Sequence, residues 1–194
     1  MKFDEYMRLN ESDESKRTFC YMVYADTPYK EQLLALQQSL NITSQELVPI
    51  NEFHCTIRYV KLSGEQSPKL FTQWLETQQL PLLEAFTSGF SMFKDGALVL
   101  TLDSPQLQEW FDKIDSWMTD SGGYKKSDYP TYKPHITLAY NTTSPLPVYD
   151  PRSHRLNVKF SIHKVTDTNH NVVLERRVQG WKGQEYGSVS QQKS

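Results

Sequence analysis

The sequence predicts an α+β domain in which two strand-helix-strand lobes are related by a pseudo-twofold axis. A turn of the same chemistry opens a helix twice, at Asp26-Thr27-Pro28 and at Asp103-Ser104-Pro105, with a hydroxyl suited to the N-cap and a proline suited to the first helical turn. Each helix is followed by a strand with His-x-Thr between apolar residues, at His54 and His135. The prolines are 77 residues apart and the histidines 81, a near-constant spacing that indicates internal duplication.

The first lobe consists of a strand, a helix and the first motif strand. Apolar and aromatic residues fill 18–25 and 53–60, with the length and composition of strands. Between them, leucines at helical spacing predict a helix over 29–40. A helix over 69–78 and a strand over 85–93 follow before the second lobe begins.

The second lobe repeats the same order. A strand over 97–102 leads into a helix over 106–118, whose apolar residues recur every three or four positions. The second motif strand is expected over 133–140. Two further strands, 155–165 and 172–178, are joined by a polar turn and complete the domain.

We expect one domain over 18–178, because nothing in a chain of 194 residues requires a second core. Residues 1–17 are polar and charged, and are interpreted as an N-terminal arm. Residues 179–194 are rich in Gly, Ser and Gln and predict a flexible tail, in which Trp181 makes a candidate lid.

Composition narrows the classes of partner. The net charge of −2 provides no basic field for long nucleic acid and leaves small anionic ligands open. The chain has no apolar run of 18 residues and begins with charged residues, so we expect neither membrane association nor secretion, but a cytoplasmic protein. Cys20 and Cys55 lie in apolar strand-like runs and are expected to be buried free thiols in a reducing compartment.

The two motifs predict proton-transfer chemistry. Residues i and i+2 of a strand share a face, so His54 with Thr56 and His135 with Thr137 point to one side and form a polar cleft when the strands lie together. One imidazole accepts a proton while the other donates one, and the hydroxyls donate to phosphate oxygens. Phosphodiester cleavage follows as the reaction class. Two histidines without an acidic cluster are too few for a closed zinc site, so we expect no metal and no cofactor.

Paired His-x-Thr motifs about eighty residues apart, on duplicated lobes, resemble the 2H phosphoesterase superfamily over residues 18 to 178. The resemblance implies a bilobal α+β fold with antiparallel sheets flanking a central cleft. It also implies metal-free catalysis by His54 and His135, with Thr56 and Thr137 binding phosphate. The substrates it implies are ribonucleotide phosphodiesters.

Within the superfamily, the chain is similar to the phage anti-CBASS phosphodiesterases, which degrade cyclic oligonucleotide messengers of a bacterial immune pathway. The similarity lies in an aromatic first strand and in a carboxylate followed by a tryptophan beyond the last strand. Strand parity adds an arginine two residues past the first motif threonine, and a basic, aromatic loop enters the second motif. The resulting substrate-binding candidates are Tyr21, Tyr24, Arg58, Tyr132, Glu175 and Trp181. Core packing of the tyrosines and of Trp181 is the alternative.

The leading hypothesis is therefore a metal-independent phosphodiesterase for cyclic di- or trinucleotides, which acts in the host cytoplasm if it is phage-encoded. One alternative is a phosphodiesterase for RNA with 2′,3′-cyclic phosphate ends or for 2′-5′ oligoadenylate. Another is a non-catalytic nucleotide-binding protein that retains the fold. Intact histidines and threonines in both motifs favour an enzyme over the last alternative.

Overall fold

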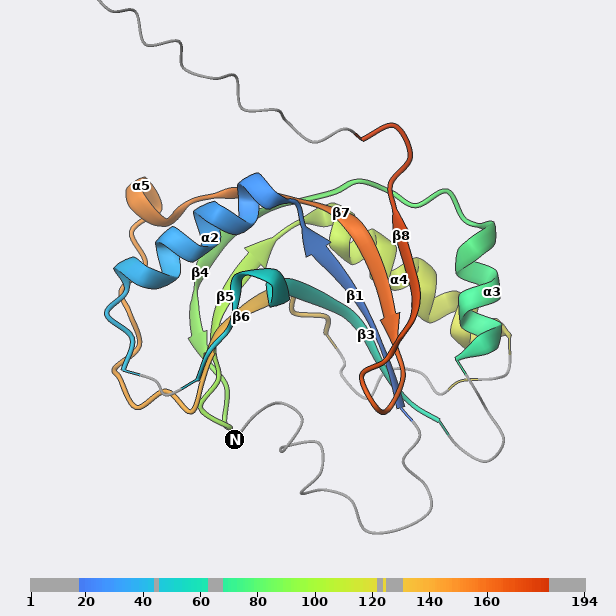
Figure 1. The fold of residues 1–194 in the computed structure, drawn as a ribbon, viewed down its shortest axis with the longest axis horizontal. Coiled ribbons are helices and arrows are strands. Elements are labelled where there is room, and N and C mark those ends of the chain that lie inside the picture. Colours follow the sequence, from blue (N-terminus) through green and yellow to red (C-terminus); the bar gives the residue numbers. More distant parts are fainter. Residues whose placement is uncertain (1–17, 44–45, 63–67, 122–123, 125–130, 182–194) are drawn as a thin grey trace, which may run out of the picture.

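The computed structural model describes residues 18–43, 46–62, 68–121, 124 and 131–181. Every strand and helix expected from the sequence is present, together with three short elements that were not expected: β2 (Glu46–Leu47), η1 (Ile50–Glu52) and α5 (Pro151–His154). The predicted arm, and the tail beyond Trp181, lie outside the described residues. The elements, in chain order, are β1 (Thr18–Ala25), α2 (Thr27–Ser39), β2 (Glu46–Leu47), η1 (Ile50–Glu52), β3 (His54–Lys61), α3 (Lys69–Thr77), β4 (Leu83–Met92), β5 (Leu98–Asp103), α4 (Pro105–Asp120), β6 (His135–Tyr140), α5 (Pro151–His154), β7 (Asn157–Thr166) and β8 (Val172–Arg177) (Figure 1).

The strands form one antiparallel sheet system made of two similar halves. The order is β1-β3-β6-β5-β4-β7-β8, and β7 also pairs with β1. One lobe is therefore β3-β1-β7, extended by β8, and the other is β6-β5-β4. The lobes join where β3 meets β6 and where β4 meets β7. This arrangement confirms the predicted α+β fold of two pseudo-twofold-related lobes.

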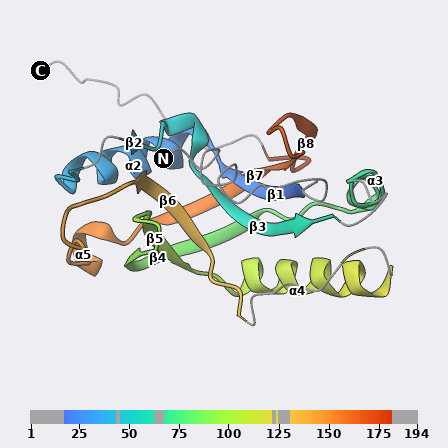
Figure 2. The same ribbon diagram turned by 90° about the horizontal axis from the view of Figure 1, so that it is seen from below.

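Each long helix contacts both lobes: α4 packs against β4 of its own lobe and β3 of the other, and α2 packs against β7 of its own lobe and bonds to β6 of the other. Helix α4 follows β5, yet the indole N–H of Trp110 donates to the Tyr21 hydroxyl of β1 at 2.9 Å. Helix α2 follows β1, yet the Gln37 amide donates to the backbone carbonyl of Leu138 in β6 at 2.6 Å. In Figure 2, α2 and α4 lie on opposite sides of the strands. These two hydrogen bonds join the lobes to each other.

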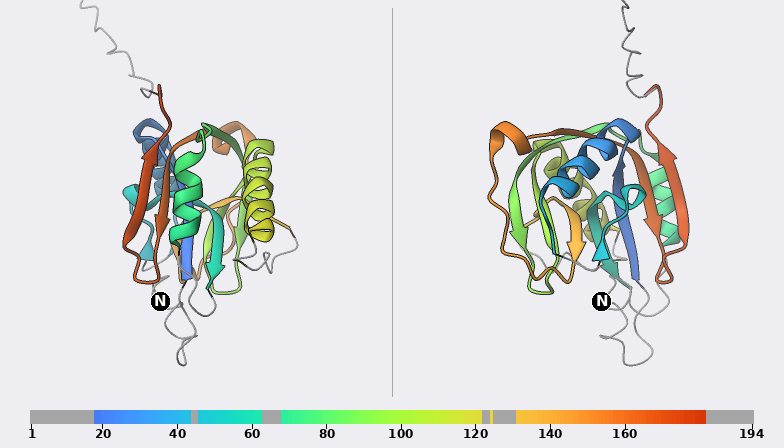
Figure 3. Two further views of the ribbon diagram at one scale, coloured as in Figure 1. Left: turned by 90° about the vertical axis from the view of Figure 1, so that its right-hand side faces the viewer. Right: turned by 60° about the vertical axis from the view of Figure 1, so that its left-hand side comes forward.

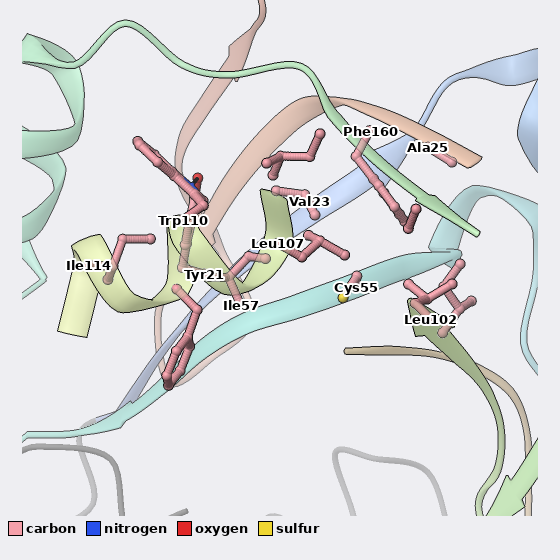
Figure 4. Packing of buried hydrophobic residues seen from close by; sticks show 14 of the residues in the cluster. Tyr21, Val23, Ala25, Cys55, Ile57, Leu102, Leu107, Trp110, Ile114 and Phe160 are labelled. Atoms are coloured by element: carbon pink, nitrogen blue, oxygen red, sulfur yellow. Dashed lines mark hydrogen bonds between the residues drawn. The ribbon is translucent and has the colours of Figure 1, made fainter. Parts of the chain in front are cut away.

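Part of the core lies where the sheet faces α4 (Figure 4), and α2 and α3 contribute further buried residues such as Leu33 and Phe71. Tyr21, Ile57, Leu107 and Ile114 are fully or almost fully buried there. Burial of such side chains contributes roughly 1.5–3 kcal/mol each. Strand β8 lies at the end of the strand order, and Figure 3 shows it at the outer edge of the molecule.

A hydrogen-bond chain crosses this core from α4 to the loop before β4. The Tyr21 hydroxyl accepts from Trp110 and lies 2.5 Å from Nδ1 of His163. The other ring nitrogen of His163 lies 3.0 Å from the Pro81 carbonyl, which can only accept, so Nε2 carries the hydrogen and Nδ1 accepts from Tyr21. The substrate-binding prediction for Tyr21 is therefore wrong: its side chain is 0% exposed and serves the core.

Protein stability should fall in acid because of His163. Burial lowers its pKa to about 4, whereas the unfolded chain titrates near about 6.5. Between these pH values only the unfolded state binds the proton, so stability falls as pH drops from 6.5 to 4, by about 3 kcal/mol. Urea unfolding at several pH values should show this loss, and His163→Gln should remove it. Equal pH dependence in both proteins would contradict the assignment.

The start of α4 agrees with the prediction, and the start of α2 does not. Ser104 caps α4 as expected, because its hydroxyl accepts from the Leu107 amide at 3.1 Å. Thr27 was expected to cap α2, but it is the first helical residue and Asp26 occupies the N-cap without a capping hydrogen bond from its side chain. The Asp26 carboxylate instead accepts from Arg177 at 2.9 Å and from the Trp181 indole.

Candidate active site

The two His-x-Thr motifs meet where the lobes join. Strands β3 and β6 are antiparallel and pair through Cys55 and Ile136, the middle residues of the motifs. The antiparallel register places His54 across from Thr137, and Thr56 across from His135. Cys55 and Ile136 are fully buried, whereas the four motif side chains occupy the opposite face and are half-buried. Two histidines and two threonines thus lie together on one face of this strand pair.

A bulge follows each motif at the same position. The register shifts between Thr56 and Arg58 in β3, and between Thr137 and Ala139 in β6. Each bulge reverses the strand parity directly after the threonine. The shared irregularity supports the internal duplication. It also limits the sheet face that carries the motif histidines and threonines, called the catalytic face below, to two residues of each motif.

Both imidazoles are held in the same tautomer. Nδ1 of His54 lies 2.7 Å from the Glu52 carbonyl, and Nδ1 of His135 lies 2.7 Å from the Lys133 carbonyl. A carbonyl only accepts, so Nδ1 carries the hydrogen in each neutral ring and Nε2 presents its lone pair. Each ring is oriented by a backbone group two residues earlier, and either ring is ready to accept a proton.

Burial lowers the pKa of both histidines. For His54, burial is the largest cause, the Glu52 carbonyl opposes it, and the nearby His135 lowers the pKa further. For His135, burial again dominates and the Lys133 carbonyl opposes it. Both rings are therefore neutral at pH 7 in the free protein, and an anion between them favours protonation of one.

We expect the optimum of kcat/KM to lie on the acid side of about pH 6.5, the usual pKa of a histidine. The reaction needs one neutral and one protonated ring, and both pKa values lie below their usual value. The optimum of kcat should lie at a higher pH, since a bound phosphodiester anion raises the pKa of the imidazole that acts as the acid. Initial rates from pH 5 to 9 test this, and a kcat/KM optimum above pH 8 would contradict the pair.

An aromatic ring lies beside each histidine. Tyr24 in β1 lies 5.2 Å from His54 between ring centroids, and Phe93, directly after β4, meets His135 edge-on at 4.8 Å. Phe93 is 37% exposed, so part of its ring is accessible beside His135. Tyr24 was predicted from the sequence. Phe93 was missed, and its one signal was a large aromatic residue at the end of an expected strand.

Arg58 was predicted to face the phosphate, and the structure contradicts this. The bulge after Thr56 turns Arg58 to the core face, where its guanidinium pairs with Asp115 of α4 at 2.8 Å and lies 5.8 Å from the Phe111 ring. The Arg58 side chain is 3% exposed. It joins β3 to α4 and does not reach a substrate on the catalytic face.

Tyr132 was predicted to line the substrate site, and it lies on the core face of β3. Its ring stacks on Phe111 at 4.5 Å, and its hydroxyl donates to the Thr56 carbonyl at 3.1 Å. The Cys55 thiol lies 3.4 Å from the same hydroxyl. Tyr132 therefore supports the first motif from the side opposite to His54 and Thr56.

Glu175 lies on the same side of the sheet as the motif side chains, whereas Trp181 packs, partly buried, against the core. Glu175 pairs with Lys164 at 2.9 Å, and Lys164 is the register partner of Met22 in β1. The Trp181 indole donates to Asp26, and the Lys159 ammonium lies 5.4 Å from its ring centroid. Trp181 is thus half-buried and anchored to the turn that follows β1.

The two cysteines are free and buried, as expected. Cys20 lies on the catalytic face, with its sulfur 4.0 Å from Thr56 Oγ1. Burial raises the pKa of Cys20 to about 12 and that of Cys55 to about 11, so both remain thiols and neither is a nucleophile at neutral pH.

Metal clusters and membrane spans were both expected to be absent. No group of three His, Cys, Asp or Glu side chains that could hold a metal ion occurs in the part of the chain that the structure describes. None of the helices in that part has the length and apolar character needed to cross a membrane.

Several solved structures share this fold, and one of them is described as a phosphoesterase. The LigT structure of E. coli complexed with 3′-AMP has a TM-score of 0.59 at 14% identity and covers 86% of this chain and 99% of that chain. TT0787 of Thermus thermophilus has a TM-score of 0.59 at 15% identity, and the match covers 84% of this chain and 98% of that chain. At this identity the likeness to both structures shows the fold alone.

Sequence comparison shows the family. The anti-CBASS protein Acb1 of Acinetobacter phage Ac42 is 28% identical over 133 residues, which cover 67% of this chain and 77% of that protein. The family model described as anti-CBASS protein Acb1 matches residues 20–176, which include both motifs and nearly all of the described domain. The chain therefore belongs to the anti-CBASS protein Acb1 family.

Proposed function

We propose that this protein is a metal-independent phosphodiesterase that cleaves 3′-5′ linkages of cyclic di- and trinucleotide immune messengers. The observation that carries the proposal is the pair of imidazoles with the same tautomer, set across one strand pair with a threonine hydroxyl beside each. Such a pair supplies a base and an acid on the two sides of one phosphorus atom.

The reaction begins at a ribose 2′-hydroxyl of the substrate. One neutral imidazole takes its proton through Nε2 as the 2′-oxygen bonds to the adjacent phosphorus. The second histidine, protonated, gives its proton to the departing 5′-oxygen as the P–O5′ bond breaks. A 2′,3′-cyclic phosphate and a free 5′-hydroxyl result. Water then opens the cyclic phosphate with the two roles exchanged.

The threonines stabilise the charge that develops on phosphorus. Thr56 lies across from His135 and Thr137 across from His54, so each non-bridging oxygen has a hydroxyl donor beside the imidazole of the other motif. Loss of one such preorganised donor costs about 10²–10³ in kcat in other enzymes. The arrangement is symmetrical, which suits a reaction whose second step reverses the roles of acid and base.

The family supports a cyclic oligonucleotide as the substrate. Both the family and its phage Ac42 member are described as anti-CBASS proteins. LigT, which shares the fold, has been crystallised with 3′-AMP and with ATP. Phe93, half-exposed beside His135, offers a ring on which a base can stack. A phage relative also supports action in the host cytoplasm.

A substrate panel tests the proposal. Cyclic dinucleotides, 2′-5′ oligoadenylate and RNA with a 2′,3′-cyclic phosphate end are each incubated with the protein and with its His54→Ala variant. We expect the wild type alone to linearise a cyclic dinucleotide. Cleavage confined to the other two substrates would identify the RNA-directed alternative, and tight binding without any cleavage would identify a nucleotide-binding protein.

A further inference from the structure

The ring of Tyr24 brings two lysines to the His54 side of the site. The Lys164 ammonium of β7 lies 4.7 Å from the Tyr24 ring centroid, and the Lys30 ammonium, from the first turns of α2, lies 5.7 Å from it. The His54 ring lies 5.2 Å from the same centroid. Both ammonium groups and a candidate catalytic imidazole therefore contact the same aromatic ring.

The lysines differ in how their charges are balanced. Lys164 pairs with Glu175 at 2.9 Å. The Lys30 ammonium has no hydrogen bond or salt bridge to any residue that the structure describes, and its contact there is with the Tyr24 ring. Burial lowers the pKa of Lys30, the positive charges of Lys164 and Arg177 lower it further, and the carboxylates of Asp26 and Glu175 oppose this shift. An incoming anion would stabilise this ammonium, since the carboxylates that act on it, Asp26 and Glu175, already pair with Arg177 and Lys164.

The other lobe has neutral residues, Thr101 and Ser91, at the positions of Tyr24 and Lys164, because Ser91 pairs with Val99 as Lys164 pairs with Met22. Thr101 pairs with His135 in the register of β5 and β6, as Tyr24 pairs with His54 in that of β1 and β3. The Thr101 hydroxyl donates to the Gly89 carbonyl at 3.0 Å. The motif pair is thus symmetrical, but the residues beside it are not, and Lys164 on the His54 side has a neutral counterpart on the His135 side.

We propose that Lys30 and Lys164 form a second phosphate site, which binds a phosphate of the substrate other than the one being cleaved. The inference rests on the proposed function and specifies its substrate class: nucleotides that carry at least two phosphates, with one nucleoside between the scissile phosphate and the second. A cyclic di- or trinucleotide meets this requirement. A dinucleoside with a single phosphodiester does not, although it offers the same reacting bond.

The test compares these two substrates in lysine variants. We expect Lys30→Gln and Lys164→Gln each to raise KM for a cyclic dinucleotide about 10-fold, while kcat/KM for the 3′-5′ dinucleoside monophosphate ApA changes less than about 2-fold. Lys30→Arg should retain most of the affinity. Lys113→Gln is the matched control, because Lys113 makes the same kind of contact, 5.0 Å from the Trp110 ring, on α4.

The outcomes separate this inference from the proposed function. Equal losses on both substrates would overturn the second phosphate site, because the lysines would then act on the scissile group or on the fold. Unchanged KM for the cyclic dinucleotide would overturn it as well. Either result leaves the wild-type phosphodiesterase intact. If the wild type cleaves neither substrate, the proposed function itself is overturned.

Discussion

Replacing His54 or His135 by alanine should lower kcat at least about 100-fold. The account assigns proton acceptance to one ring and proton donation to the other, and their roles exchange between the two steps, so neither variant can complete a turnover at the wild-type rate. Both rings are half-buried on the sheet face opposite the core, so the variants should stay folded. Steady-state rates with a cyclic dinucleotide, alongside circular dichroism, provide the measurement.

His170→Asn is the matched control for these variants. His170 is exposed in the turn between β7 and β8, and its φ of 61° suits asparagine. This variant should keep wild-type kcat. Full activity in either His54→Ala or His135→Ala would remove that residue from the catalytic pair.

A cyclic dinucleotide with 2′-deoxyribose at both 3′-5′ linkages should bind without being cleaved. In the proposed reaction the nucleophile is the substrate's own 2′-hydroxyl, and the deoxy compound lacks it. The phosphates that the threonines and lysines are proposed to contact remain, so the compound should act as a competitive inhibitor. Its inhibition constant should be close to the KM of the ribose substrate.

Cleavage of the deoxy compound at a rate near that of the ribose compound would contradict this mechanism. Water would then be the nucleophile, and the two imidazoles would act on water rather than on a ribose hydroxyl. A substrate that lacks only one of the two 2′-hydroxyls serves as the internal control, since it should be cut at the ribose linkage alone.

The sequence was sufficient to predict the elements other than β2, η1 and α5, and the meeting of the two motifs. Period-two alternation fixes which side chains share a face, and duplication brings the motif strands together at the axis. The same alternation failed at Arg58, because a bulge reverses parity directly after Thr56. No local pattern marks that bulge. Ile57 looks like any other strand residue, and only the pairing with β1 reveals the extra position.

The remaining errors come from contacts between residues far apart in the chain. Tyr21 belongs to the core because it bonds with Trp110 and His163, 89 and 142 residues away. Lys30 and Lys164 gain significance only because both approach the Tyr24 ring. Such placements depend on the packing of helices on sheets, which periodicity within one segment does not encode.

The central claim is that this chain's own imidazoles and hydroxyls cleave a cyclic oligonucleotide without a metal. The most direct test follows a cyclic dinucleotide by chromatography after exhaustive treatment of the protein and buffers with EDTA. We predict an unchanged rate and a transient product that ends in a 2′,3′-cyclic phosphate. Loss of cleavage in EDTA, with recovery on addition of Mn²⁺ or Mg²⁺, would contradict the account.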